Sequence, residues 1–284
     1  MVPMRRNWIA PILLGGAVLL AACTDPNEQV EEAVKDINII DNANLNNLML
    51  TASDPDEAVN YFKRAVASNP ERIDLLRGLA QSQVRAGNYR EAVNVWEVVI
   101  AHPQTETADS VDFADALIRQ GDWKRAEEVL DGIPPTHETF KRYRLEAMIA
   151  DGNKEWSKAD SFYETAVGLT TTPSGALNNW GYSKLTRGDY AEAEKLFGEA
   201  LKYDPGMFTA KNNFVMARGL QRNYTLPVVS MTQTERAMLL DTLARAAVKL
   251  GDVETAKTLF KQAIDTHPQH FDAAVSSLRA LEQG

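Results

Sequence analysis

Small and large apolar residues recur along this chain with a long, regular period. An alanine returns about every 34 residues, and one interval is roughly twice as long. These alanines are Ala58, Ala92, Ala126, Ala159, Ala193 and Ala256. Four positions after each alanine stands a large apolar residue: Phe62, Trp96, Leu130, Tyr163, Phe197 or Phe260. Because residues four apart lie on one face of an α-helix, the pattern predicts a series of similar amphipathic helices.

Turn and stop residues fall between the predicted helices. A glycine followed by aspartate or asparagine precedes several of them, at Gly87, Gly121, Gly188 and Gly251. We expect the glycine to adopt the left-handed conformation that ends a helix, and the next residue to cap the following helix. Proline, which cannot continue a helix, follows at the end of a unit, as at Pro205. Each unit is therefore predicted to be a pair of antiparallel helices.

The clearest unit runs over residues 174–205. Its key positions are Leu177, Trp180, Gly181, Gly188, Asp189, Tyr190, Ala193, Phe197, Ala200 and Pro205. This order of small and large residues resembles the tetratricopeptide repeat, a pair of helices about 34 residues long. We therefore predict an all-α tetratricopeptide-repeat solenoid of about six to seven units over residues 31–284. Gly181 and Ala193 are expected to lie buried between two closely packed helices.

Some stretches depart from the regular pattern. Residues 152–156 indicate a longer turn. Residues 223–232 contain proline and β-branched residues where a second helix is due, so we expect a non-helical segment. Its apolar side chains are expected to cover the core; the alternative is that they form an edge where a partner docks. Thr232 and Glu235 are spaced for a capping box at the start of the next helix. Residues 271–282 are predicted to form a capping helix over the end of the solenoid.

The first residues differ from the rest of the chain. Arg5 and Arg6 precede an apolar run over residues 8–20, which is short for a membrane span and typical of a signal peptide. The run ends in Leu-Ala-Ala-Cys at Cys23, the sole cysteine of the chain. This ending resembles the bacterial lipobox, whose cysteine is lipidated. We predict a signal peptide over residues 1–22 and lipidation of Cys23; the alternatives are an ordinary signal peptide or a short membrane anchor.

Lipidation of Cys23 predicts where the protein resides. Lipoproteins kept in the inner membrane typically carry aspartate directly after the cysteine, and this chain has Thr24 there. The resemblance therefore implies a lipid anchor in the outer membrane of a Gram-negative bacterium, with the chain facing the periplasm. Residues 23–30 would form a short linker, and a single cysteine leaves no disulfide to support the fold.

Composition and motifs give no indication of catalysis. The net charge is −9 at pH 7 and becomes more negative without Arg5 and Arg6, which argues against nucleic acid as a partner. The sequence has no phosphate-binding loop and no Ser–His–Asp pattern. His267 and His270 have the separation of a metal pair, but they stand at a predicted helix end with a proline between them. We therefore expect a non-enzymatic protein without a cofactor, metal or small-molecule substrate.

Protein binding remains, and the repeat predicts its place. The first helices of tetratricopeptide units line a concave groove. The repeat register places these residues on it: Arg77, Gln81, Asp115, Arg119, Asn178, Tyr182, Asn212, Met216, Asp241 and Arg245. The pairs Asn178-Asn179 and Asn212-Asn213 occupy equivalent positions in successive units. Their amides can bind an extended peptide backbone; the alternative is that one asparagine of each pair only links neighbouring helices.

A lipobox followed by these repeats resembles the TadD family, lipoproteins of tight-adherence (Flp-type) pilus assembly. Residues 226–237, 251–253 and 266–271 and the Asn-Asn-Trp-Gly-Tyr stretch at 178–182 carry the resemblance. It implies an outer-membrane-anchored assembly factor that binds pilus or secretin components, as a pilotin or scaffold for the secretin channel. Two other kinds of repeat lipoprotein remain as alternatives: an adaptor for envelope proteases or peptidoglycan hydrolases, and a subunit of the β-barrel assembly machinery.

Overall fold

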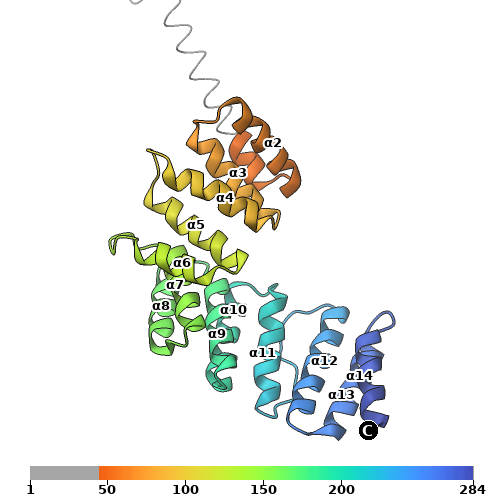
Figure 1. The fold of residues 1–284 in the computed structure, drawn as a ribbon. Helices are drawn as coiled ribbons and strands as arrows, with labels where there is room; N and C mark the ends of the chain where they lie inside the picture. Colours follow the sequence, from red (N-terminus) through yellow and green to blue (C-terminus); the bar gives the residue numbers. More distant parts are fainter. Residues whose placement is uncertain (1–44, 284) are drawn as a thin grey trace, which may run out of the picture.

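In the computed structural model, which describes residues 45–283, every regular element is an α-helix (Figure 1). Residues 45–51 are helical, and the helices that follow are α2 (Pro55–Ser68), α3 (Ile73–Arg85), α4 (Tyr89–Ala101), α5 (Thr107–Gln120), α6 (Trp123–Asp131), α7 (Phe140–Gly152), α8 (Trp156–Gly168), α9 (Ser174–Thr186), α10 (Tyr190–Tyr203), α11 (Phe208–Leu220), α12 (Gln233–Lys249), α13 (Val253–Thr266) and α14 (Asp272–Gln283). Figure 1 shows the helices stacked in chain order, with a change of direction near α7 and α8. We call α2–α6 the N-terminal arm and α9–α14 the C-terminal arm.

The helices pair as the repeat predicts. Each unit packs its first helix on its second, as α3 on α4 and α9 on α10, and the second helix then packs on the next unit, as α10 on α11. The repeat alanines lie on the second helices and are fully buried, and the large apolar residue four positions later is buried in every unit. The predicted all-α solenoid is therefore confirmed.

Close approach of the two helices explains the small residues of the pattern. A Cβ atom placed on Gly181 of α9 would lie 2.7 Å from the Phe197 ring of α10, so no larger residue fits there without movement. Ala193 is buried in the same cluster, together with Phe197 and Ala217 of α11. A Cβ atom placed on Gly78 of α3 would lie even closer to the Phe62 ring of α2.

The turns within the units share one geometry. Gly188 has a φ of 85°, and the Asp189 N–H donates to the Lys184 carbonyl at 2.9 Å. The prediction of a longer turn over residues 152–156 is wrong: Lys154 takes the left-handed conformation with a φ of 61°, and the Glu155 N–H donates to the Ala150 carbonyl at 2.8 Å. A lysine thus stands where the other turns have glycine, and the turn keeps its length.

The residue after each glycine caps the next helix at Asp122, Asp189 and Asp252, whose carboxylates accept a backbone N–H of the first turn. Asn88 was expected to do the same and does not. Its Nδ2 donates to Gln83 Oε1 at 2.9 Å, so its side chain is held by the preceding helix.

Residues 221–232 replace the second helix of the unit that begins with α11. Arg222 has a φ of 63° and ends α11 with the same turn, but the chain then continues without helix to Thr232. Leu226 and Met231 pack against the core of α12–α14, and Val229 packs against the core formed by α9–α11. Val228 points into solvent. Most apolar side chains of the segment thus cover the core that the missing helix leaves open.

The far end of the solenoid is closed as expected. Thr232 and Glu235 form the predicted capping box at the start of α12, in which the Glu235 N–H donates to Thr232 Oγ1 at 3.1 Å and the Thr232 N–H donates to Glu235 Oε2 at 2.7 Å.

The last helix covers the end of the stack. Helix α14 packs on α13 and buries Ala274, while Phe271 contacts the same core. Helix α14 is therefore the predicted capping helix.

Cys23, the signal peptide and the linker to residue 30 lie outside the described residues. Within residues 45–283, no helix combines the length and the apolar character that crossing a bilayer requires.

Candidate functional site

First helices of successive units touch one another along one side of the solenoid. Helix α5 contacts α7, α7 contacts α9, and α9 contacts α11. These first helices form the inner face of the stack, which we call the groove. The sequence-predicted binding residues all lie on first helices, from Arg77 on α3 to Arg245 on α12.

A cavity with a volume of about 530 Å³ lies in the middle of this groove. We call it the central cavity. Helices α7, α9 and α11 supply most of its lining, with Trp123 from α6 and Trp156 and Tyr163 from α8. It is lined by Trp123, Met148, Asp151, Gly152, Trp156, Tyr163, Asn178, Asn179, Tyr182, Ser183, Thr186, Thr209 and Asn213. Asn178 and Tyr182 are thus brought together here, whereas Asn212 and Met216 are not part of the lining.

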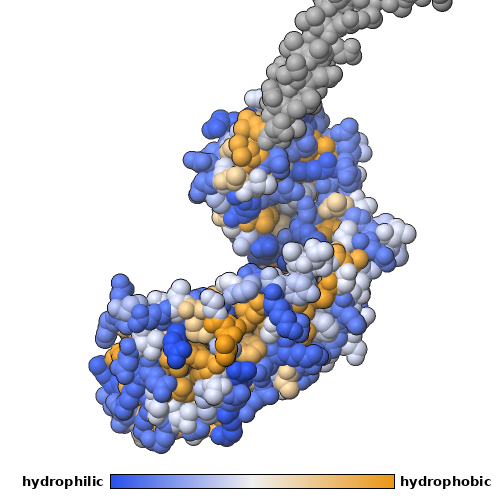
Figure 2. All heavy atoms as spheres, turned by 180° about the vertical axis from the view of Figure 1, so that it is seen from behind, coloured by the Kyte–Doolittle hydropathy of each residue, from blue (hydrophilic) through white to orange (hydrophobic). Residues whose placement is uncertain are grey.

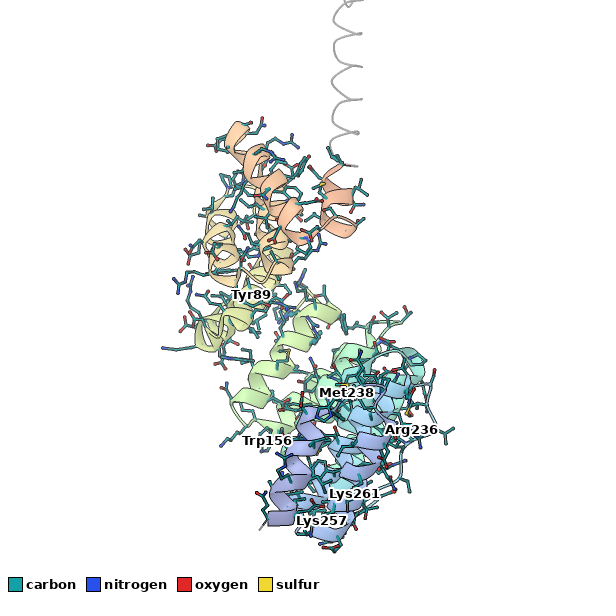
Figure 3. The ribbon with its side chains drawn as sticks, turned by 90° about the vertical axis from the view of Figure 1, so that its right-hand side faces the viewer. Tyr89, Trp156, Arg236, Met238, Lys257 and Lys261 are labelled. Atoms are coloured by element: carbon teal, nitrogen blue, oxygen red, sulfur yellow. The ribbon has the colours of Figure 1, made fainter. Side chains whose placement is uncertain are left out.

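Aromatic rings stand around the opening. Trp123 is 44% exposed and Tyr182 is 55% exposed, which is high for such large side chains. Trp156 stands where the two arms meet (Figure 3), and the Arg187 guanidinium lies over its ring at 5.2 Å from the centroid. Half-exposed aromatic side chains at a cavity are typical of a binding surface, because contact with a partner removes their apolar area from water.

The asparagine amides link neighbouring first helices in part. Asn213 Nδ2 donates to Asn178 Oδ1 at 3.2 Å, and Thr242 Oγ1 donates to Asn212 Oδ1 at 2.6 Å. Asn179 Nδ2 approaches Met148 Sδ at 3.7 Å, which is a weak interaction. These asparagine hydrogen bonds therefore connect successive units. The Nδ2 group of Asn178 makes no hydrogen bond to a described residue.

Asp151 on α7 lies in the lining of the cavity and is held by two hydroxyl groups. Ser183 Oγ donates to Asp151 Oδ1 at 2.5 Å, and Tyr163 Oη donates to Asp151 Oδ2 at 3.2 Å. Burial raises the pKa of Asp151, and these two hydrogen bonds offset the shift only in part. Burial also raises the pKa of the Tyr163 phenol, so the phenol remains a donor.

Asp160 on α8 shows the opposite behaviour nearby. Arg187 Nη2 lies 2.7 Å from Asp160 Oδ1, and Lys184 Nζ lies 2.9 Å from Oδ2. Burial alone would raise the pKa of Asp160, but the hydrogen bonds from Arg187, Lys184 and Trp180 lower it to about 2. Lys184 and Arg187 on and directly after α9 are therefore engaged by Asp160.

The N-terminal groove, formed by α3, α5 and the start of α7, is closed by ion pairs between units. Arg77 on α3 binds Asp109 on α5 with both oxygens engaged, at 2.7 and 2.8 Å. Gln81 Nε2 donates to Asp112 Oδ2 at 3.2 Å. Lys141 of α7 bridges Asp112 at 2.6 Å and Asp115 at 3.1 Å. The polar groups of Arg77 and Gln81 therefore bind residues of the neighbouring unit.

The remaining predicted residues are also paired. Asp115 binds Arg119 on the same helix at 3.1 Å, and Asp241 binds Arg245 at 2.7 Å. Gln81 and Asp115 also line a smaller cavity of about 350 Å³ between α3, α5 and residues 47–51. These residues lie on the groove, but intramolecular partners occupy their charges.

Sequence reasoning missed several residues of the central cavity that the repeat register contains. Met148 is the α7 counterpart of Tyr182, and it would have emerged had the register been applied to residues 140–152. Trp123 and Trp156 each stand three positions before a repeat alanine. The position of Asp151 carried no such signal. No cluster of three or more His, Cys, Asp or Glu side chains suited to a metal ion occurs within residues 45–283.

Comparison with known proteins agrees with this architecture. Three segments match the tetratricopeptide repeat family: residues 49–109, 174–207 and 242–284. A curated relative, tetratricopeptide repeat protein 21B of Mus musculus, is 26% identical over 111 residues, which are 39% of this chain and 8% of that protein. The match thus spans a small fraction of the relative's length.

Solved structures share the fold at low identity. The APC/C hetero-tetramer Cut9-Hcn1 superposes with a TM-score of 0.57 and 13% identity, over 82% of this chain and 47% of that one. A tetratricopeptide repeat protein from Parabacteroides merdae has a TM-score of 0.52 and 15% identity, over 89% and 98% of the two chains. A thermophilic repeat protein of Thermus thermophilus has a TM-score of 0.51 and 19% identity, over 57% and 90%.

Proteins of this fold typically act as non-catalytic scaffolds that bind other proteins through an extended concave surface. The repeat alanines, the shared turns, the stacked helix pairs and the three matching segments together show that the chain is a tetratricopeptide-repeat solenoid protein.

Proposed function

We propose that this protein is a lipid-anchored periplasmic adaptor that binds an extended segment of another protein in its groove. In this proposal, Cys23 carries the acyl chains that hold the protein in the outer membrane of a Gram-negative bacterium. The adaptor serves the assembly of a Flp-type, tight-adherence pilus, as a pilotin or scaffold for the secretin.

The central cavity is the observation that supports groove binding. It combines half-exposed aromatic rings with amides and one carboxylate, on a rigid wall formed by α7, α9 and α11. Such a surface offers apolar area for affinity and a few polar groups for orientation. The N-terminal groove lacks this combination, because its polar groups bind each other.

The pilus assignment is supported by sequence resemblance. Residues 226–237 resemble the TadD family, and they include the end of the segment that replaces a helix. The lipobox ending at Cys23 supports the anchor.

A site-specific crosslinking experiment in the native bacterium tests the groove and the partner together. A photo-crosslinking amino acid replaces Tyr182 in the central cavity. In a matched control, it replaces Val98, which is 52% exposed on the second helix α4. We expect position 182, and not position 98, to crosslink to the pilus secretin or another pilus component, identified by mass spectrometry.

Other results would redirect the proposal. A protease or peptidoglycan hydrolase crosslinked at position 182 would replace the pilus role with the alternative adaptor role. Equal crosslinking at both positions, or none at either, would contradict groove binding. For the anchor, Cys23→Ser should abolish acyl labelling and release the protein from the outer-membrane fraction; unchanged labelling would contradict lipidation.

A further inference from the structure

We propose that the central cavity binds a basic side chain, lysine or arginine, of an extended protein segment, with its cation against Asp151 and its alkyl stem between Trp123 and Tyr182. This inference rests on the proposed function, because it assumes that a protein segment lies in the groove. It adds the chemistry of the residue that the groove selects.

Asp151 stands apart from the other acidic residues on the first helices. Each of the others that is partly or fully buried has a cationic partner: Asp109 with Arg77, Asp112 with Lys141, Asp115 with Arg119, Glu146 with Arg142, Glu235 with Lys211, and Asp241 with Arg245. Asp151 forms no ion pair with a described residue and receives only the two neutral hydroxyl groups. A carboxylate has about four acceptor sites, so about two remain for a ligand.

Arg187 attracts the Asp151 carboxylate electrostatically, but it forms its ion pair with Asp160 and donates no hydrogen bond to Asp151. Arg187 and Lys184 both bind Asp160 at less than 3 Å. Asp151 therefore keeps a partly buried carboxylate with an incomplete set of partners, and burial raises its pKa. A ligand cation would offset this desolvation and form a charge-assisted hydrogen bond.

The aromatic rim suits the rest of such a side chain. Trp123 comes from α6 and Tyr182 from α9, and both line the same cavity as Asp151. The methylene stem of lysine or arginine packs on aromatic faces, and a cation near a ring gains further attraction. Figure 2 shows a concave region between the two arms, which leaves space for a polypeptide chain to approach.

The remaining lining fits an extended backbone beside that side chain. The unpaired Nδ2 of Asn178 provides a donor for a peptide carbonyl. An acidic ligand residue at the same place would meet the Asp151 carboxylate and be repelled. The net charge of −9 also favours a basic partner segment.

Peptide selection with the full-length protein in detergent tests the inference. A displayed library of random 12-residue peptides is selected against the wild type, Asp151→Asn and Asp241→Asn. Asp241→Asn is the matched control, because Asp241 is also a groove carboxylate but has Arg245 as its partner. We expect lysine or arginine at one fixed position with the wild type and the control, and no such preference with Asp151→Asn.

Titration of one selected peptide then measures the effect directly. The peptide is compared with an analogue in which norleucine replaces the basic residue. Wild type should bind the analogue at least about tenfold more weakly, while Asp151→Asn should bind both peptides alike. Circular dichroism verifies that the variants are folded. If a variant does not fold, the comparison of the two peptides on the wild-type protein still tests the inference.

The outcomes separate the inference from the proposed function. Selected peptides without a preferred basic residue, or the same preference in Asp151→Asn, would overturn the inference and leave groove binding intact. Equal losses in Asp151→Asn and Asp241→Asn would also overturn it, because the effect would not be local to the cavity. Failure of the wild type to select any peptide would overturn both.

Discussion

The N-terminal groove and the central groove use the same repeat positions for different purposes. In the N-terminal groove, Arg77 reaches across to Asp109, and Lys141 bridges Asp112 and Asp115. In the central groove, formed by α7, α9 and α11, Asp151 has only hydroxyl partners and Tyr182 is more than half exposed.

The difference suggests two uses of groove side chains: some bind neighbouring units to each other, and others remain available for a ligand. Ion pairs between successive first helices fix the angle between units, but they leave few polar groups for a partner. Side chains without full partners do little for the stability of the unit and remain available for a ligand. A solenoid can combine both, because each unit packs only on its neighbours.

The largest stability loss should come from breaking the N-terminal groove. Arg77→Ala removes the partner of Asp109, which is only 4% exposed, and leaves its charge buried and unpaired. We expect a loss of about 3 kcal/mol in the free energy of unfolding, measured with urea. Arg236→Ala is the control: Arg236 is exposed on α12 (Figure 3), and its loss should change stability by less than about 0.5 kcal/mol. Equal effects would refute the role of the inter-unit pair.

Asp160 binds Trp180 and Lys184 of α9, a helix of the central groove, and its contribution to stability should depend on pH. Its pKa is lowered to about 2, so its ion pairs stabilise the fold above pH 3.8 and the stabilisation is lost as the pH falls toward 2. Asp160→Asn should lose about 2 kcal/mol at pH 7. The difference from wild type should shrink between pH 5 and pH 2.5 in thermal unfolding. A difference independent of pH would show that the charge is not responsible.

The segment that replaces a helix should contribute a smaller amount to stability, through the core of the C-terminal arm. Leu226 packs on the core beside α11, whereas Val228 is fully exposed. Leu226→Ala should cost about 1 kcal/mol and Val228→Ala close to nothing, because only the first removes buried apolar area. Similar thermal midpoints for both variants would mean that the segment does not cover the core.

The smallest effect on stability is expected at the proposed recognition residue. Asp151→Asn keeps one oxygen that accepts from Ser183 or Tyr163, and its amide NH2 can donate to the oxygen of the other hydroxyl group. The variant also removes a charge that burial disfavours. Stability at pH 7 should change by less than about 0.5 kcal/mol. Because the folded-state pKa is raised, the charge destabilises the protein at high pH, and this penalty disappears as the pH falls below 3.8. The variant should therefore gain relative to wild type as the pH rises from 4 to 8, and a relative loss would contradict the unpaired state of Asp151.

Sequence reasoning recovered the architecture because a repeat restates the same packing rule many times. The buried alanines, Gly181 against Phe197, and the left-handed Gly188 each follow from local spacing. It went wrong at residues 152–156, where Lys154 adopts the conformation usually left to glycine. The packing of the neighbouring helices imposes that turn, and the lysine side chain gives no reason to expect a left-handed conformation from the sequence.

The sequence by itself determined the helix pairs, the register of the groove, the interruption over residues 223–232 and the closing helix α14, because these depend on local helix periodicity, capping and proline. Tertiary structure alone decided which groove charges are paired. Arg77 and Asp109, or Asp151 and Ser183, are about one repeat apart in sequence and meet only when the units stack. Whether a carboxylate meets a cation or only a hydroxyl group depends on side-chain reach across that interface, and this leaves Asp151 available for the binding that we propose at the central cavity.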